Sequence, residues 1–321
     1  MNKKNDRIFV AGHKGMVGSA IFRKLQNDGY KNIIISEKKK LNLENQYQVN
    51  IFFKQNKLDY VFLCAAKVGG IQANDIFPAD FITKNLLIQT NVINAAFQNK
   101  VKKLIFLGSS CIYPIEDKKR ISENNILTGK LEMTNEPYAV AKIAGIKMCE
   151  SFNRQYNTDY RSLMPTNLFG PGDNYHKTNS HVMASLIRKF IIAKRKNHKS
   201  VTVWGSGKPR REFLFVDDFA SSAVYFAKMS KSKYYKYVPQ RTNIVNIGYG
   251  TDFSIKEVAE LIKKIIGYKG KIIFDRSKKD GVKRKLLNIG LMKKLGRKPN
   301  KNFEKNLKDY INSIKHKIIF D

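Results

Sequence analysis

A tyrosine and a lysine four residues apart, Tyr138 and Lys142, form a pair suited to acid–base chemistry. They fall at the start of a predicted helix, where this spacing places two side chains on one face, about 6 Å apart along the axis. An ammonium group beside a phenol stabilises the phenolate and lowers its pKa, so the tyrosine can exchange protons near neutral pH. The same spacing also arises by chance on helix surfaces, so the pair needs context.

Ser109 supplies that context, because it follows the apolar run KLIFLG at residues 103–108. A short apolar run predicts a buried strand, and ligands of open α/β sheets bind at the carboxyl ends of the strands. The hydroxyl of Ser109 is therefore expected at the edge of the sheet where a substrate would lie.

A glycine-rich segment near the N-terminus predicts a dinucleotide site. Gly12, Gly15 and Gly18 follow the apolar run 7–11 and open a helical pattern. Glycines there let the chain approach a pyrophosphate, and the helix N-terminus offers free N–H groups to the anion. The spacing is G-x-x-G-x-x-G rather than the more common G-x-G-x-x-G, so an ordinary tight turn is the alternative.

The charges that follow the second predicted strand bear on the choice of cofactor. An acidic residue there would bind the ribose 2′-hydroxyl of NAD, whereas basic residues accommodate the 2′-phosphate of NADP. Lys38 and Lys14 could hold a 2′-phosphate, and Glu37 could serve NAD if it points inward. A solvated charge run is the plain alternative. NADP(H) is the favoured cofactor.

Apolar runs and helical patterns alternate along the first half of the chain. Strands are predicted at 7–11, 32–36, 59–66, 103–109 and 160–168, and helices at 85–98 and 137–156. This order is typical of an α/β protein with a Rossmann-type, doubly wound parallel sheet.

The pattern changes after residue 169 and predicts a smaller, discontinuous C-terminal substrate domain. The elements predicted after residue 169 are helices at 181–196, 217–229 and 254–266, an extended hairpin at 201–216, strands at 242–248 and 271–275, and a basic C-terminal helix. Segments 1–170 and 212–248 are expected to form the NADP-binding Rossmann domain, and segments 171–211 and 249–321 the substrate domain.

Composition narrows the possible partners. The chain of 321 residues carries a net charge of +34, but its lysines are scattered rather than gathered in a stripe, which favours a generally basic surface over nucleic-acid binding. A phosphate-bearing ligand is the remaining explanation. No long apolar stretch or signal peptide is evident, so neither a membrane partner nor secretion is expected. Three cysteines without metal-ligand spacing predict no metal site and a reducing cytoplasm.

Several long segments resemble the GDP-L-fucose synthase family of the extended short-chain dehydrogenase/reductases. They are GHKGMVGSAI, AAKVGGIQAN, LGSSCIYP, NEPYAVAKIAGIKMCESFNRQY, MPTNLFGPGDN, SHVMASLIRKF and VWGSGKPRREFLFVDD. The resemblance extends over nearly the whole chain. It implies a homodimeric enzyme that performs NADPH-dependent 3,5-epimerisation and 4-reduction of GDP-4-keto-6-deoxy-D-mannose to GDP-L-fucose.

The resemblance also implies catalytic roles. Tyr138 would protonate the C4 oxygen as hydride reaches C4, Lys142 would lower the pKa of Tyr138 and hold the nicotinamide ribose, and Ser109 would bind the C4 oxygen. Cys111 and His181 would be the acid–base pair at C3 and C5, where the C4 ketone acidifies the protons. A small core cysteine and a structural histidine are the alternatives.

Binding residues are implied by the same resemblance. For the cofactor they are Gly12, His13, Lys14, Gly15, Met16, Val17, Gly18, Lys38, Leu107, Gly108, Ser109, Lys142, Pro165, Thr166, Asn167, Leu168 and His181; for the GDP-sugar they are Lys189, Trp204, Arg211, Asp280 and Lys285. Lys14 and Lys189 stand where the family carries arginines, so the charge is kept but the bidentate fork is lost. Trp204 could instead be a packing residue and Arg211 a surface charge.

Two other functions compete with this interpretation. One is another extended-family nucleotide-sugar epimerase, reductase or dehydratase, although dehydratases usually carry a threonine and an acid where this chain has Ser109-Ser110-Cys111. The other is a non-catalytic protein that senses NADP or binds nucleic acid, which the presence of all five catalytic candidates opposes.

Overall fold

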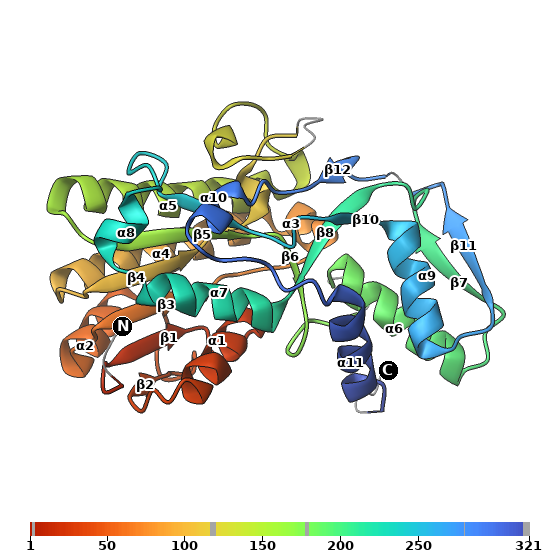
Figure 1. Ribbon diagram of the computed structural model, residues 1–321, viewed down its shortest axis with the longest axis horizontal. Coiled ribbons are helices and arrows are strands. Elements are labelled where there is room, and N and C mark those ends of the chain that lie inside the picture. Colours follow the sequence, from red (N-terminus) through yellow and green to blue (C-terminus); the bar gives the residue numbers. More distant parts are fainter. Residues whose placement is uncertain (2–3, 116–119, 177–179, 279, 317–321) are drawn as a thin grey trace.

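The computed structural model describes residues 1, 4–115, 120–176, 180–278 and 280–316, and within them six parallel strands form the central sheet (Figure 1). The sheet has the order β2-β1-β3-β4-β5-β9. Its strands are β1 (Ile8–Ala11), β2 (Ile33–Ile34), β3 (Tyr60–Leu63), β4 (Lys103–Leu107), β5 (Tyr160–Pro165) and β9 (Ile244–Ile247). The predicted Rossmann-type sheet is confirmed.

Helices cover both faces of this sheet, as a doubly wound fold requires. One face carries α1 (Met16–Asn27) and α7 (Val216–Lys228), which pack against each other. The other carries α2 (Gln46–Asn56), α4 (Pro78–Gln98) and α5 (Glu136–Tyr156), as Figure 1 shows. Helix α4 begins seven residues before the predicted start at residue 85, with Pro78 in its first turn, where proline is favoured.

The order of the strands places a ligand crevice beside the glycine loop. After β2 the chain crosses back over β1 to form β3, so the loops that leave β1 and β3 diverge from neighbouring strands. Such a switch in direction opens a crevice at the carboxyl ends of the strands. Gly12 and Ala65 approach each other closely there.

A second group of strands lies beyond the central sheet, at the right of Figure 1. Strands β6 (Asn167–Phe169), β8 (Arg210–Phe215), β10 (Asp252–Ser254) and β12 (Arg284–Lys285) pair with one another, and β7 (Ser200–Trp204) pairs with β11 (Lys271–Asp275). Around them lie α6 (Val182–Arg195), α9 (Ile255–Ile266) and α11 (Phe303–Ile314). The shorter helices are α3 (Ile71–Ile76), α8 (Lys231–Tyr235) and α10 (Gly290–Lys294), and the 3₁₀ turns are η1 (Ser110–Ile112), η2 (Glu123–Asn125) and η3 (Met133–Asn135).

Two strand predictions are wrong. The hairpin at 201–216 does not form, because β7 pairs in parallel with β11 while β8 pairs with β6, β10 and β12. Gly205 and Gly207, both at positive φ, turn the chain between β7 and β8. The strand predicted at 160–168 is divided: β5 ends at Pro165 in the central sheet, and Asn167 begins β6 in the second group.

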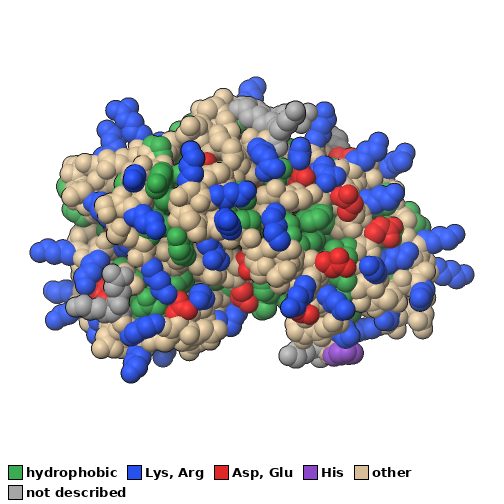
Figure 2. Space-filling view, viewed as in Figure 1, with side chains coloured by type: hydrophobic (Ala, Val, Ile, Leu, Met, Phe, Trp, Pro, Cys, Tyr) green, Lys and Arg blue, Asp and Glu red, His purple; other side chains and the backbone are tan. Residues whose placement is uncertain are grey.

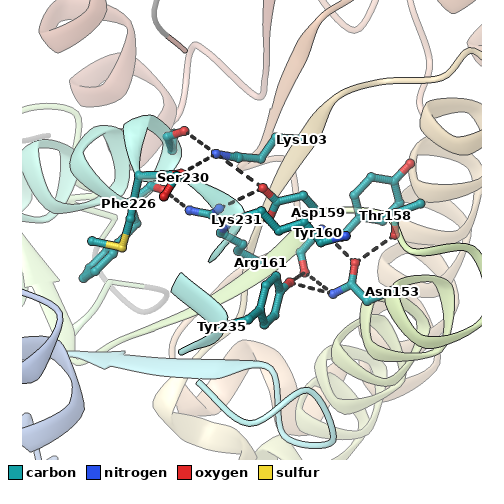
Figure 3. A network of polar contacts seen from close by, with 12 residues as sticks. Lys103, Asn153, Thr158, Asp159, Tyr160, Arg161, Phe226, Ser230, Lys231 and Tyr235 are labelled. Atoms are coloured by element: carbon teal, nitrogen blue, oxygen red, sulfur yellow. Dashed lines mark hydrogen bonds and ion pairs between the residues drawn. The ribbon is translucent and has the colours of Figure 1, made fainter. Parts of the chain in front are cut away.

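A buried polar network fixes the amino end of the central sheet to α7 (Figure 3). Arg161 is 0% exposed and donates to both carboxylate oxygens of Asp159, at 2.6 and 2.7 Å. Lys103, the first residue of β4, donates to the carbonyls of Ala227 at 2.8 Å and Met229 at 2.7 Å. A cation is favourable at the C-terminus of a helix, so Lys103 binds the end of α7 to the sheet.

The face of the molecule seen in Figure 2 is basic, and its positive charges are not gathered in one patch. In the view of Figure 2, Lys and Arg side chains are spread over the whole face with few acidic groups between them. No helix in the described part of the chain is both long and apolar enough to span a membrane. The sequence also offers Ile143, Ile146 and Met148 on α5 as apolar positions for a dimer contact; Ile143 and Ile146 are buried in the chain's own core, and Met148 is partly buried against it.

Candidate active site

The glycine loop leaves an open cradle at the start of α1. A Cβ on Gly12 would lie 2.7 Å from the Ala65 nitrogen, and one on Gly18 would lie 2.1 Å from the Gly12 carbonyl oxygen. Packing within the chain therefore requires both glycines. A Cβ on Gly15 would meet nothing nearer than 3.5 Å, so the outer side of the loop is free. No side chain caps α1, which leaves the N–H groups of its first turn, including Met16 and Val17, available to a pyrophosphate.

Ion pairs hold the lysines expected at the adenosine ribose. The Lys14 ammonium lies 2.7 Å from the Glu37 carboxylate and lowers the pKa of that carboxyl. Lys38 is paired instead with Glu44, at 2.8 Å. The loop after β1 and the segment after β2 therefore meet, with Lys14 and Glu37 at the contact. His13 lies near Glu37, and its Nδ1 is buried without a hydrogen-bond partner among the described residues.

Tyr138, Lys142 and Ser109 converge at the carboxyl end of β4. Lys142 is 4% exposed, and its Nζ donates to the Leu107 carbonyl at 2.8 Å. The same Nζ lies 5.8 Å from the centre of the Tyr138 ring. Ser109 is hydrogen-bonded to the Tyr138 side chain. Gly108, between Leu107 and Ser109, has no room for a Cβ, which would lie 2.1 Å from the Met164 methyl carbon.

The ionisation of this pair differs from the prediction. Burial raises the pKa of Tyr138, and negative charge at Cys111 acts in the same direction, while the hydrogen bond to Ser109 lowers it. Burial also lowers the pKa of Lys142 to about 8. The expected lowering of the tyrosine pKa is therefore wrong, because burial raises this pKa and the Lys142 ammonium donates to the Leu107 carbonyl. At neutral pH the phenol keeps its proton, which is the form that a proton donor needs.

Cys111 lies beside this group, in the 3₁₀ turn η1. Its N–H donates to the Ser109 hydroxyl at 3.2 Å, which fixes the backbone after β4. A negative charge on its sulfur would raise the pKa of both Tyr138 and Arg211, so the thiol lies within electrostatic reach of a phenol and a guanidinium. The Nδ2 of Asn135 lies 3.7 Å from Sγ. Nothing in the sequence alone singles out Asn135, except that it precedes Tyr138 by three residues.

His181 lies on a different element from the other catalytic candidates. It is the N-cap of α6 and is exposed to solvent, although the surrounding protein lowers its pKa by desolvation. Among the described residues, no hydrogen bond or ion pair joins it to Cys111 or Tyr138. Residues 177–179, which shortly precede it, lie outside the described part of the chain.

The residues expected to bind the GDP-sugar form two neighbouring groups. Lys189 lies with its Nζ 5.2 Å from the centre of the Trp204 ring, and the Trp204 side chain is 59% exposed. Lys285 and Arg211 are direct register partners in β12 and β8. Asp280 joins the two groups, since its carboxylate accepts from the Ser206 N–H at 2.8 Å and interacts electrostatically with Arg211. An exposed aromatic ring among cations suits a nucleotide base and its phosphates.

The segment from Pro165 to Leu168 links the central sheet to this surface. Both Thr166 and Asn167 donate to the Glu212 carbonyl, at 3.2 and 2.9 Å. One further residue belongs at the sheet edge: the thiol of Cys64, which follows β3, acts electrostatically on Lys142. Its position after an apolar run was the available signal, although the sequence favours a plain core residue. Among the described residues, no group of three or more His, Cys, Asp or Glu side chains could hold a metal ion.

Comparisons with known proteins agree on one family. The sequence model of the NAD dependent epimerase/dehydratase family matches residues 8–248. A GDP-L-fucose synthase of Escherichia coli (strain K12) is 51% identical over 90% of both chains. GDP-L-fucose synthase 1 of Arabidopsis thaliana is 49% identical over 93% of this chain and 90% of its own. A GDP-mannoheptose C4 reductase of Campylobacter jejuni, solved with NADP bound, is 36% identical with a TM-score of 0.88, over 98% of this chain and all of its own.

Proposed function

Because the chain belongs to the NAD dependent epimerase/dehydratase family and, within it, to the GDP-L-fucose synthases, we propose that it converts GDP-4-keto-6-deoxy-D-mannose to GDP-L-fucose. It is an NADP-dependent epimerase/reductase that acts on a GDP-sugar. The observation that carries the proposal is the convergence of Ser109, Tyr138 and Lys142 at the carboxyl end of β4, beside the open glycine cradle. NADPH, when bound there, supplies the hydride for C4.

In the reduction, Tyr138 is the proton donor. Its phenol is protonated at neutral pH and transfers the proton to the C4 oxygen as C4 becomes an alcohol. Ser109 holds the same oxygen by a hydrogen bond. Lys142 binds the nicotinamide ribose and places a positive charge beside the tyrosinate that remains, which favours release of the proton.

In the epimerisation, Cys111 and His181 exchange protons at C3 and C5. The C4 ketone acidifies both neighbouring positions, because the carbanion formed is an enolate. Cys111 is next to the reduction site, and His181 comes from the N-terminus of α6. The enzyme would therefore be multifunctional, with both chemistries at one bound sugar.

The division of the chain follows from the same roles. Segments 1–170 and 212–248 would bind NADPH, using the glycine loop, Lys14, Lys38, residues 107–109 and Pro165 to Leu168. Segments 171–211 and 249–321 would bind the GDP-sugar through Lys189, Trp204, Asp280 and Lys285, with Arg211 at the boundary. The exposed apolar side chains Leu87 on α4 and Val140 on α5 support a homodimer, and the free thiols support a cytoplasmic location.

The test is oxidation of the reduced nicotinamide, followed by its absorbance, with GDP-4-keto-6-deoxy-D-mannose and NADPH or NADH in parallel. The expected result is oxidation of NADPH with GDP-L-fucose as the product. If folded protein that binds NADPH oxidises neither cofactor with this sugar, another keto-sugar must be the substrate. GDP-6-deoxy-D-talose or GDP-D-rhamnose as the product would show reduction without epimerisation and would overturn the role of Cys111 and His181.

A further inference from the structure

Asn135 stands at the N-cap of α5 but does not cap the helix. An asparagine at this position usually accepts a hydrogen bond from the N–H two or three residues on. Here no side chain caps α5, and the Asn135 amide turns to Cys111, with Nδ2 3.7 Å from Sγ. Its Oδ1 is buried without a hydrogen-bond partner among the described residues. The Asn135 amide therefore points at the thiol and not at the start of the helix, where Pro137 offers no N–H.

The backbone around Asn135 holds the amide in this orientation. Its N–H donates to the Glu132 carboxylate at 3.2 Å, so the preceding turn η3 is capped by Glu132. Cys111 is fixed from the other side, because its N–H donates to Ser109. Two elements that pack together, α5 and η1, therefore present the amide and the sulfur to each other.

The contact between the Asn135 amide and the Cys111 sulfur can affect the ionisation of the thiol. A neutral thiol is a weak acceptor, whereas a thiolate accepts hydrogen bonds strongly, so an N–H donor favours the ionised form. The titratable groups within electrostatic reach of Cys111 are the neutral phenol of Tyr138 from α5 and the charged Arg211 guanidinium from β8. Arg211 lies within electrostatic reach of the sulfur, and the Asn135 amide adds a directed donor.

We propose that Asn135 is a positioning residue whose amide N–H orients the Cys111 sulfur for its role as the base of the epimerisation. The thiolate takes a proton from the carbon next to the C4 ketone, forming an S–H bond as the C–H bond breaks. The electron pair moves into the enolate, and return of a proton to the opposite face inverts the centre. The catalytic part of this inference rests on the proposed function, whereas the effect of Asn135 on the thiol does not.

The first test measures the thiol without any substrate. Alkylation of Cys111 by iodoacetamide is followed by peptide mass spectrometry across pH in the unaltered protein, Asn135→Ala, Asn135→Asp and the control Asn99→Ala, which changes an asparagine at the C-cap of α4. In Asn135→Ala the midpoint should rise by about one pH unit. It should rise further in Asn135→Asp, whose carboxylate repels the thiolate, and stay unchanged in Asn99→Ala. Thermal unfolding checks that each variant is folded.

The second test measures exchange of the C3 and C5 protons of the keto-sugar with deuterated solvent. Asn135→Ala should lower the rate about tenfold at neutral pH and recover part of it as pH rises, because the thiol then ionises without its donor. An unchanged alkylation midpoint in folded Asn135→Ala and Asn135→Asp would overturn the role of Asn135. A shifted midpoint in a protein whose unaltered form exchanges no sugar protons would overturn the proposed function and the catalytic part, and leave the stabilised thiolate.

Discussion

Strand β4 has a buried lysine at each of its ends, and the two are partnered differently. Lys103 begins the strand and is 6% exposed, while Lys142 binds the last carbonyl of the strand and is 4% exposed. Burial lowers the pKa of each to about 8. Lys103 has two carbonyl partners and the Asp159 carboxylate at 3.4 Å (Figure 3). Lys142 has one carbonyl and, among the described residues, no carboxylate.

The difference separates a structural cation from a chemical one. A buried charge with a full set of partners holds elements together, and Lys103 joins β4 to the end of α7. A buried charge without a counter-ion is unfavourable for stability and is retained where chemistry needs it. The amino end of this sheet is therefore its structural end, and on the proposed mechanism the carboxyl end, with Lys142 beside Tyr138, is its reactive end.

Removal of the charge at the reactive end should have the largest effect. Lys142→Met should lower the rate of reduction by about 10²–10⁴-fold, because the tyrosine loses the cation that favours release of its proton. The free energy of unfolding should stay the same or rise. Lys147→Met on the same helix is the control for activity and should leave the rate of reduction unchanged, although it removes the ion pair with the buried Glu150 carboxylate. Steady-state kinetics and urea unfolding measure the rate and the free energy of unfolding, and a fully active Lys142→Met would refute the contrast.

Removal of the charge at the structural end should affect stability instead. Lys103→Met leaves the carbonyls of Ala227 and Met229 without a donor, and we expect a loss of about 2 kcal/mol in the free energy of unfolding. Because the variant no longer buries an ammonium group, the loss of stability is partly offset. The activity per folded molecule should persist. Lys102→Met, whose exposed ammonium pairs with Asp59, is the control. Equal stability of the two variants would mean that the network does not hold α7.

The pH dependence should distinguish the two lysines again. The pKa of Lys142 falls from its ordinary value of 10.5 to about 8, so the ammonium is lost as pH rises through 8. The rate of reduction should therefore decline several-fold above pH 8. Between 8 and 10.5 the unfolded chain binds more protons at both lysines, so their contribution to stability rises with pH. Lys142→Arg should remove the alkaline decline in rate, and Lys103→Arg should keep it.

The smallest expected effect is on the choice of cofactor, and it comes from an exposed lysine that is already ion-paired. Lys14 and Glu37 form an exposed ion pair where the 2′-phosphate of NADP would bind. Glu37→Gln should free Lys14 and raise the preference for NADP⁺ over NAD⁺ about two- to fivefold, measured as the ratio of the two dissociation constants by calorimetry. Glu44→Gln tests Lys38 in the same way. If only Glu44→Gln changes the ratio, Lys38 rather than Lys14 faces the phosphate.

Local patterns in the sequence predict most of the sheet and its glycine loop. Strands such as 103–109 and the helix at 137–156 are visible because apolar periodicity and turn residues act over a few positions. The pairing of β7 with β11 depends on residues about 70 positions apart, so the hairpin prediction failed. Likewise, the pKa of Tyr138 depends on burial, and the turn of Asn135 towards Cys111 depends on packing between segments. Neither the pKa of Tyr138 nor the orientation of the Asn135 amide can be predicted from neighbouring residues in the sequence.

The central claim is that Tyr138 performs the reduction and Cys111 the proton exchange at one sugar. The most direct measurement follows deuterium entering C3 and C5 of GDP-4-keto-6-deoxy-D-mannose in deuterated water, together with NADPH oxidation. Tyr138→Phe should incorporate deuterium without oxidising NADPH, and Cys111→Ser should lose incorporation far more than hydride transfer. Equal loss of both activities in both variants, with each protein folded, would contradict the account.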